Sequence, residues 1–199
     1  MLRIGLTGGI AAGKSTASAR FAELGAAIVD HDVLARRAVE PGSAALVEIV
    51  RAFGDRVIRD GALDRPALAD VVFHDDAARE QLDAIVHPYV FAMSGAADRQ
   101  ARAEGAHVVV HDIPLLVEAG GNRDFGMVVT INADEDVRIE RLTASRGMTR
   151  ADARARVRAQ ASDEQRAAIA DVVLDGNGTA DDLRAQVDQF WELHVPRTP

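Results

Sequence analysis

The 199-residue sequence predicts an α/β fold: a P-loop NTPase-type parallel sheet flanked by helices, with a helical substrate-binding insertion and a helical lid. Three observations predict this fold. First, a glycine-rich loop separates an alternating apolar strand pattern from a helix pattern. Second, short apolar runs recur along the chain with helical segments between them. Third, two of these runs lead into aspartate.

The glycine-rich loop has the spacing G-x-x-x-x-G-K-S over residues 8–15. An alternating strand pattern over residues 2–6 precedes it, and a helix pattern over residues 15–24, which Gly25 ends, follows it. Such a loop surrounds phosphates with backbone N–H groups, its lysine meets the β- and γ-phosphates, and its serine hydroxyl is placed for Mg²⁺. Lys14 is the only lysine among 23 basic residues, the others being arginines. We therefore expect this chain to bind a nucleoside triphosphate.

Four further strands are expected, at residues 26–29, 108–112, 127–131 and 172–174, and a closing helix at 183–193. Because strand–helix–strand connections are parallel and right-handed, the carboxyl ends of these strands meet at the edge that carries the glycine-rich loop. Asp32 and Asp112 are the best candidate carboxylates at that edge. For each of them, a helix cap or a turn is the alternative role.

Residues 33–104 show helical spacing with no convincing strand. One helix begins after Ser43 and ends at Gly54, and a second begins at Asp64 and Pro66. A third carries Leu82, Ile85 and Val86 and reaches His87-Pro88. This segment is a candidate for binding a second substrate, with simple packing as the alternative.

The segment 138–158 holds seven arginines against Glu140 and Asp152, a net charge of 7 − 2 = +5 in a protein whose net charge is −8. Thr149 and Asp152 resemble a capping box. The helix that follows has only Val157 as a large apolar residue, so we expect it to bury little and to be mobile. A basic lid that closes over the triphosphate is the favoured interpretation, and a solvated arginine face is the alternative.

Composition narrows the possible functions. The acidic balance argues against nucleic-acid or membrane-surface binding. The absence of cysteine excludes disulfides, thiolate catalysis and cysteine-ligated zinc. With no signal peptide and no 18-residue apolar run, the sequence predicts a cytoplasmic, soluble protein. We expect a monomer or small homo-oligomer, although the sequence does not give the oligomeric state. The expected divisions are a nucleotide-binding core (1–32, 105–137 and 162–199), the insertion (33–104) and an arginine-rich lid (138–161).

Several motifs together resemble the dephospho-coenzyme A kinase family, over almost the whole length and in the same order. They are Gly5-Leu6-Thr7-Gly8-Gly9-Ile10, Gly13-Lys14-Ser15-Thr16, Asp30-His31-Asp32 with Ala35-Arg36, Phe53-Gly54, Gly61-Ala62-Leu63-Asp64-Arg65, His87-Pro88, Ile113-Pro114-Leu115-Leu116-Val117-Glu118 and Ala170-Asp171.

The resemblance implies transfer of the ATP γ-phosphate, with Mg²⁺, to the ribose 3′-hydroxyl of dephospho-coenzyme A. It implies that Asp32 orients or deprotonates that hydroxyl, and that the insertion binds the coenzyme. The expected catalytic residues are Asp32, Lys14 and Arg141, and the expected metal ligands are Ser15 and Asp112. The expected nucleotide contacts are Gly9, Ile10, Ala11, Ala12, Gly13, Lys14, Ser15, Thr16 and Arg146. The expected substrate contacts are Thr7, Asp32, His87, Pro114, Leu115 and Glu118.

The chain departs from the family pattern at four places: Ala11-Ala12 for the usual Gly-Ser, Arg138 for a frequent Gln, His31 for a frequent Ala, and Gly176 between Asp175 and the expected Asn. Two alternative functions stay open. One is another small-molecule kinase, acting on a nucleoside monophosphate or a sugar acid. The other is a partner-dependent ATPase. A GTPase switch is not expected, because the chain has no Asn-Lys-x-Asp element.

Overall fold

The computed structural model describes residues 1–73, 75–118, 120 and 124–196. Its contacts divide the chain into two units, Met1–Asp30 with Gln100–Pro199, and His31–Arg99. Each unit has its own apolar core, and the two are considered separately. None of the described helices is long and apolar enough to cross a membrane.

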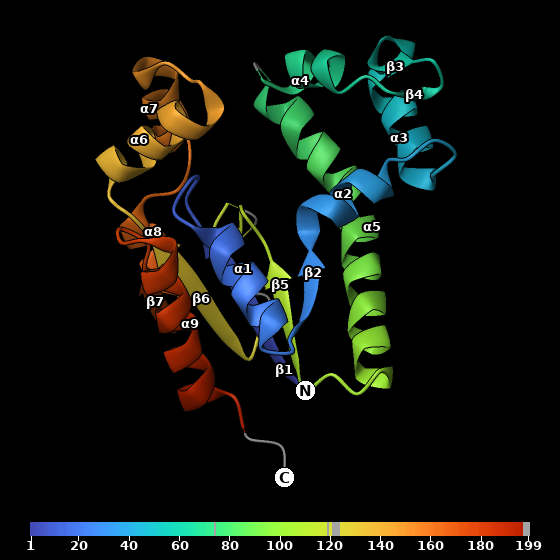
Figure 1. Cartoon of the computed structure of the whole chain (residues 1–199). Coiled ribbons are helices and arrows are strands. Elements are labelled where there is room, and N and C mark those ends of the chain that lie inside the picture. The colour runs from blue at the N-terminus through green and yellow to red at the C-terminus, as the bar shows by residue number, and fades with distance from the viewer. Residues whose placement is uncertain (74, 119, 121–123, 197–199) are drawn as a thin grey trace. The chain divides into compact units, whose positions relative to one another are not determined.

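A five-stranded parallel sheet forms the first unit (Figure 1). Its strands are β1 (Leu2–Gly8), β2 (Ala27–Asp30), β5 (Val108–Asp112), β6 (Met127–Asn132) and β7 (Val172–Asp175). They lie in the order β2-β5-β1-β6-β7, with Leu6 of β1 paired with Asp112 on one side and Val129 on the other. All five strands expected from the sequence are confirmed, and their carboxyl ends meet at one edge as the parallel arrangement requires.

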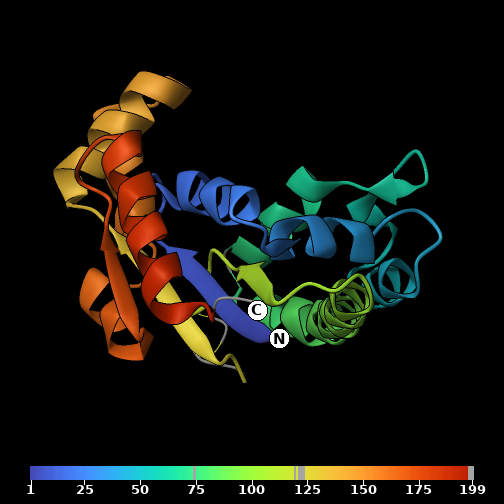
Figure 2. The same ribbon diagram turned by 60° about the horizontal axis from the view of Figure 1, so that its bottom comes forward.

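Helices α1 (Lys14–Glu23) and α9 (Ala180–His194) cover one face of this sheet (Figures 1 and 2). Ile4 and Leu6 of β1 are fully buried against them. Phe21 of α1 meets Phe190 of α9 edge to face, with ring centroids 5.5 Å apart. Burying each such side chain stabilises the fold by roughly 1.5–3 kcal/mol. This packing fixes α1, and therefore the loop that precedes it.

Helices α6 (Glu135–Arg146), α7 (Arg150–Arg158) and α8 (Asp163–Ile169) follow β6. The Thr149 hydroxyl accepts a hydrogen bond from the Asp152 N–H, which confirms the expected helix start. Val157 is the only large apolar side chain that α7 buries, as expected. The small Ala153 is buried beside it, in a cluster with Ile139 and Leu142 of α6.

The second unit contains α2 (His31–Ala38), α3 (Ala44–Phe53), the short 3₁₀ helix η1 (Asp55–Val57), α4 (Arg65–Phe73) and α5 (Asp76–Ala103, whose last turn belongs to the first unit). Ser43 caps α3 and Gly54 ends it, as expected. The expectation of no strand in this region is wrong, since β3 (Ile58–Arg59) and β4 (Ala62–Leu63) form a small hairpin. Asp60 and Gly61 join them with positive φ angles of 51° and 77°, the conformation that an Asp-Gly turn favours.

Helix α5 continues past Pro88 rather than ending there. Proline removes one helical hydrogen bond and crowds the preceding turn. The apolar residues around it, including Ile85, Val86, Tyr89 and Val90, pack against the core of the second unit. This packing keeps the segment helical across the proline.

Candidate functional site

The glycine-rich loop joins β1 to α1 at the carboxyl edge of the sheet, and its backbone is tightly folded. The Ala12 N–H donates to the Gly9 carbonyl at 3.0 Å, and the Thr16 N–H donates to the Gly13 carbonyl at 2.9 Å. Gly13 occupies the N-cap position of α1 with a φ of 115°, which a side chain rarely tolerates. The free N–H groups and positive dipole of a helix start then face the loop, so this is an anion-binding arrangement.

Lys14 Nζ forms an ion pair with the carboxylate of Asp112, the last residue of β5. Lys14 begins α1, and both side chains are largely buried. The two residues expected at the phosphates from different parts of the chain therefore lie together. A bound triphosphate would compete with Asp112 for this ammonium group.

The residues expected to hold Mg²⁺ carry oxygen groups of the type that this ion binds. Ser15 is exposed in the first turn of α1, and Asp112 offers a carboxylate at the same edge of the sheet. The described residues contain no group of three or more acidic, histidine or cysteine side chains that would hold a metal without the nucleotide. Magnesium in phosphoryl-transfer sites usually takes one or two protein ligands, with phosphate oxygens and water supplying the rest.

The segment after β5 contacts both β1 and the residues that follow α7. Thr7 is buried, and its hydroxyl donates to the Pro114 carbonyl at 3.4 Å. Leu115 is about half exposed, whereas Leu116 beside it is buried. The Glu118 carboxylate accepts a hydrogen bond from the Ala161 N–H at 2.9 Å, so this loop contacts the C-terminal end of the lid segment. Substrate contacts for Thr7, Pro114, Leu115 and Glu118 stay predictions.

Arg141, expected to be catalytic, donates hydrogen bonds to backbone carbonyls. Its guanidinium reaches Ala11 at 3.2 Å and Ala12 at 3.5 Å in the loop, and Gly178 at 2.8 Å after β7. These contacts tie α6 to the loop and to the segment after β7. Arg146, at the end of α6, is exposed. The roles of Arg141 in catalysis and Arg146 in nucleotide binding stay predictions.

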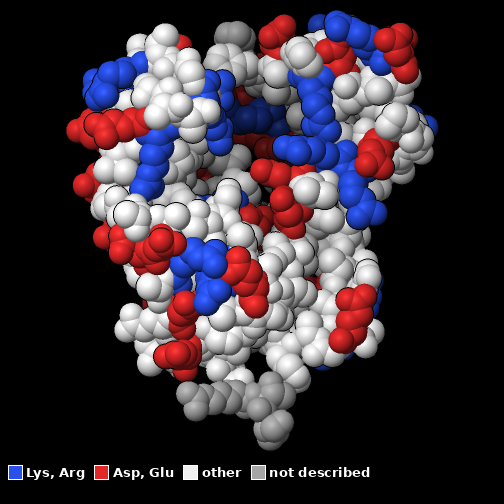
Figure 3. Space-filling model, viewed as in Figure 1, with Lys and Arg blue, Asp and Glu red and all other residues white. Residues whose placement is uncertain are grey.

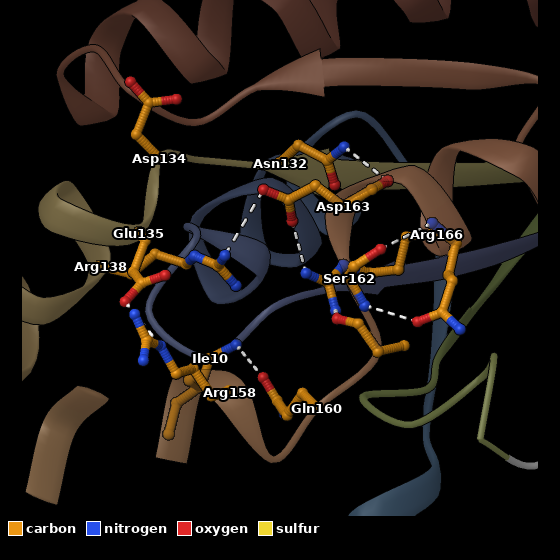
Figure 4. A network of polar contacts seen from close by, with 12 residues as sticks. Ile10, Asn132, Asp134, Glu135, Arg138, Arg158, Gln160, Ser162, Asp163 and Arg166 are labelled. Atoms are coloured by element: carbon orange, nitrogen blue, oxygen red, sulfur yellow. Dashed lines mark hydrogen bonds and ion pairs between the residues drawn. The ribbon is translucent and has the colours of Figure 1, made fainter. Parts of the chain in front are cut away.

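Two buried arginines lie behind the glycine-rich loop and share one carboxylate (Figure 4). Arg166 Nη2 donates to Asp163 at 2.5 Å, and Arg138 Nη2 donates to the same residue at 3.4 Å. Nε and Nη1 of Arg138 and Nε of Arg166 are buried without a hydrogen-bond partner in the described structure. Burial lowers the pKa of Arg138, and the neighbouring Asp163 offsets part of that effect. The cluster therefore keeps more positive charge than one carboxylate neutralises.

Gly9 of the loop lies directly against this cluster. A Cβ atom there would overlap the guanidinium of Arg138 and lie 3.0 Å from Arg166 Nη2. The backbone of the loop thus rests directly against the two arginines. Neither Asp163 nor Arg166 was expected from the sequence, since their function depends on a turn that places α8 behind the loop.

Ala11 has the left-handed backbone conformation, with a φ of 61°. This conformation costs a residue with a Cβ atom roughly 1–2 kcal/mol. The departure from the family's usual Gly at this position therefore introduces strain. Ile10 and Ala11 pack against the apolar cluster of α6 and α7, which offsets part of that cost.

The departure at Gly176 also has a structural reason. A Cβ at this position would overlap the carbonyl oxygen of Ala12, so β7 ends directly against the loop. The displaced Asn177 accepts a hydrogen bond from the Asp134 N–H at 2.8 Å and thereby satisfies the start of α6.

The arginines of the lid segment are interspersed with acidic side chains on the face shown in Figure 3. Arg154 and Arg158 of α7 lie 3.5 and 3.2 Å from Glu135 of α6, and Arg150 lies 3.8 Å from Asp136. These exposed pairs are each worth well under about 1 kcal/mol, so a polyphosphate could replace them at little cost.

Two expected site residues belong to the second unit. Asp32 is exposed in the first turn of α2, two residues after Asp30, which pairs in register with Asp112. His87 is about half exposed on α5, with Nε2 3.9 Å from Asp83. Their contacts with nucleotide or coenzyme stay predictions.

A parallel sheet in this order, with a phosphate-binding loop between its central strand and α1, defines the chain as a P-loop protein of the NTPase type. Comparison with known proteins narrows that class. The family model for dephospho-CoA kinase matches residues 2–182, so the chain belongs to the dephospho-CoA kinase family.

Individual relatives agree with this assignment. A dephospho-CoA kinase of Mycolicibacterium paratuberculosis is 55% identical over 98% of this chain and 48% of its own length. One of Thermobifida fusca is 45% identical over 96% of both chains. The crystal structure of TT1252 from Thermus thermophilus superposes with a TM-score of 0.82 at 36% identity, over 96% of this chain and 97% of that one. The chain spans about half the length of the mycobacterial relatives and almost all of the Thermobifida one.

Proposed function

We propose that this chain transfers the γ-phosphate of ATP to the ribose 3′-hydroxyl of dephospho-coenzyme A, giving coenzyme A and ADP, the final step of coenzyme A biosynthesis. The observation that carries the proposal is the family match over residues 2–182 of a chain whose glycine-rich loop has the geometry of a phosphate site. No feature of the residues that the structure describes favours the alternative acceptors or a partner-dependent ATPase.

In the proposed reaction, the 3′-oxygen forms a bond to the γ-phosphorus as the bond to the β,γ-bridging oxygen breaks. Asp32 accepts the proton of the 3′-hydroxyl, and the electron pair of the broken bond leaves with ADP. Such a transfer depends mainly on alignment and on cations near the phosphates. Lys14 supplies a compact charge, and the loop N–H groups and the start of α1 supply the surrounding donors.

Mg²⁺ belongs to the proposal, with Ser15 and Asp112 as its candidate ligands. When bound, it would neutralise charge on the β- and γ-phosphate oxygens. We further propose a cytoplasmic enzyme that acts as a monomer or small homo-oligomer on a small-molecule substrate.

A coupled assay of ADP release tests the acceptor. Mg-ATP is supplied with dephospho-coenzyme A or with adenosine monophosphate, cytidine monophosphate, shikimate or gluconate. Release with dephospho-coenzyme A alone, and a product of the mass of coenzyme A, is the expected result. Release with another acceptor would keep the kinase chemistry and overturn the substrate. ATP binding without release from any acceptor would favour the partner-dependent ATPase.

The role of Asp32 is tested by the Asp32→Asn variant. Loss of the proton acceptor should lower kcat by roughly 10²-fold or more. The affinity for ATP, measured by titration calorimetry, should stay close to wild type, because the phosphate loop is unchanged. The variant Asp70→Asn, on exposed α4 surface, serves as the matched control. Wild-type turnover by the Asp32 variant would remove this residue from the mechanism.

A further inference from the structure

The outer side of the glycine-rich loop is held by residues that follow α7. The side-chain oxygen of Gln160, two residues beyond that helix, accepts a hydrogen bond from the Ile10 N–H at 2.7 Å (Figure 4). The Ile10 amide is one of the backbone donors of the loop. The direction of the Gly9–Ile10 peptide is therefore set by a side chain from the lid segment.

Two more contacts act on the same stretch of backbone. The side chains of Ile10 and Ala11 pack on the apolar cluster that includes Ala153 and Val157 of α7. On the other side, the guanidinium of Arg138 lies against Gly9. The loop is thus held between α7 and the arginine cluster, with Gln160 as the only described side chain that bonds to the Ile10 N–H.

The strain at Ala11 indicates what this arrangement achieves. A residue stays in the left-handed conformation only when its surroundings enforce it. Here the surroundings are the Arg141 hydrogen bond to the Ala11 carbonyl and the packing on α6 and α7. The conformation of the phosphate loop therefore depends on contacts made by the lid segment.

We propose that Gln160 is a positioning residue for phosphoryl transfer: it fixes the Gly9–Ile10 peptide and so makes the shape of the phosphate loop depend on the docking of α7. This inference rests on the proposed kinase function. It adds that the lid segment acts through the loop backbone as well as through its arginines. A Gln160 that only anchored α7 would affect stability and leave the loop geometry unchanged.

The test compares Gln160→Met, which has similar length but no acceptor, with Gln160→Glu, which keeps an acceptor oxygen. Gln100→Met, at an exposed glutamine on α5, is the matched control. Five quantities are measured: kcat and KM with dephospho-coenzyme A, the dissociation constant of ATP, hydrogen exchange of the Ile10 amide by NMR, and the melting temperature.

In Gln160→Met, loss of this hydrogen bond should speed Ile10 amide exchange, weaken ATP binding and lower kcat, each about five- to tenfold. The KM for dephospho-coenzyme A should not change. Gln160→Glu should restore the protection of the Ile10 amide and at least half of the lost kcat, and Gln100→Met should match the wild type.

Wild-type kcat in Gln160→Met, or a lower kcat with unchanged Ile10 exchange, would overturn the inference. So would a lower melting temperature as the sole effect. If the wild-type protein phosphorylates no dephospho-coenzyme A, the proposed function fails by itself. ATP affinity and Ile10 exchange then decide the inference: changes in both support it, and no change in either refutes it.

Discussion

Two arginine clusters of the first unit contrast in how their charges are paired. On α1 and α9, Arg20 and Arg184 each form two hydrogen bonds to a carboxylate, Asp188 and Glu23 respectively, in partly exposed positions. Behind the glycine-rich loop, buried Arg138 and Arg166 share Asp163 and leave N–H groups without partners.

The contrast separates two uses of arginine. The α1–α9 cluster balances two positive charges with two negative ones and links the two helices. The cluster behind the loop keeps an excess positive charge where the proposed function requires an anion. A buried charge lacking a full partner is costly, so its position beside a phosphate loop indicates a functional rather than a stabilising role.

The largest expected effect comes from Asp163→Asn. Removing this carboxylate deprives two buried guanidinium groups of the acceptor that they share, which should lower the free energy of unfolding by about 3 kcal/mol. For a chain of this size the melting temperature would fall by roughly 6–12 °C. Asp188→Asn in the exposed cluster is the matched control and should cost less than about 1 kcal/mol. Equal losses in thermal melts of the two variants would contradict the comparison.

An intermediate effect of opposite sign is expected for Arg138→Gln, which restores the residue frequent in the family. Removing unpartnered buried N–H groups should raise the free energy of unfolding by about 1 kcal/mol, measured by urea denaturation. ATP binding should weaken because the positive charge behind the loop is lost. Arg20→Gln, which breaks a matched pair, should lower stability instead. A less stable Arg138→Gln protein would show that this guanidinium stabilises the fold.

The smallest expected effect is the acid sensitivity of the α1–α9 cluster. Hydrogen bonds from Arg184 and Arg20 lower the pKa of Glu23 from its ordinary value of 4.5 to about 2. A carboxyl whose pKa is depressed on folding contributes stability above its unfolded pKa, and this contribution is lost as the pH falls through the folded value. Glu23→Gln should therefore melt below the wild type at pH 6, and the two melting curves should converge between pH 4.5 and 2. A difference that persists at pH 2 would assign the effect to packing.

The sequence predicts the sheet well because buried parallel strands are short, continuous apolar runs such as Val108–Val110. The phosphate loop and the position of Asp112 beside it could be anticipated, since parallel topology brings strand ends to one edge, whereas the ion pair of Asp112 with Lys14 was not predicted. The fold of α7 on α6 could not, because its buried side chains include the small Ala153. Helix α5 passes Pro88 because tertiary packing overrides a local helix breaker.

Within the candidate site, the residues that sequence reasoning missed act on the loop from behind. No short motif contains Gln160, Asp163 or Arg166. Their contacts depend on how the chain after α7 and the helix α8 pack against the loop that follows β1. The roles of Asp32 and His87 are predictions from motif and resemblance, and the Asp32→Asn variant tests the first of them.

Lys14 has one more consequence for the study of this protein. Because it is the only lysine, every side-chain amine of the chain lies in the phosphate loop, held against Asp112. A reagent that acylates lysine therefore labels a single side chain, and the extent of labelling reports directly on whether that loop is occupied. Acylation of Lys14 can therefore measure the occupancy of the proposed nucleotide site without an engineered tag.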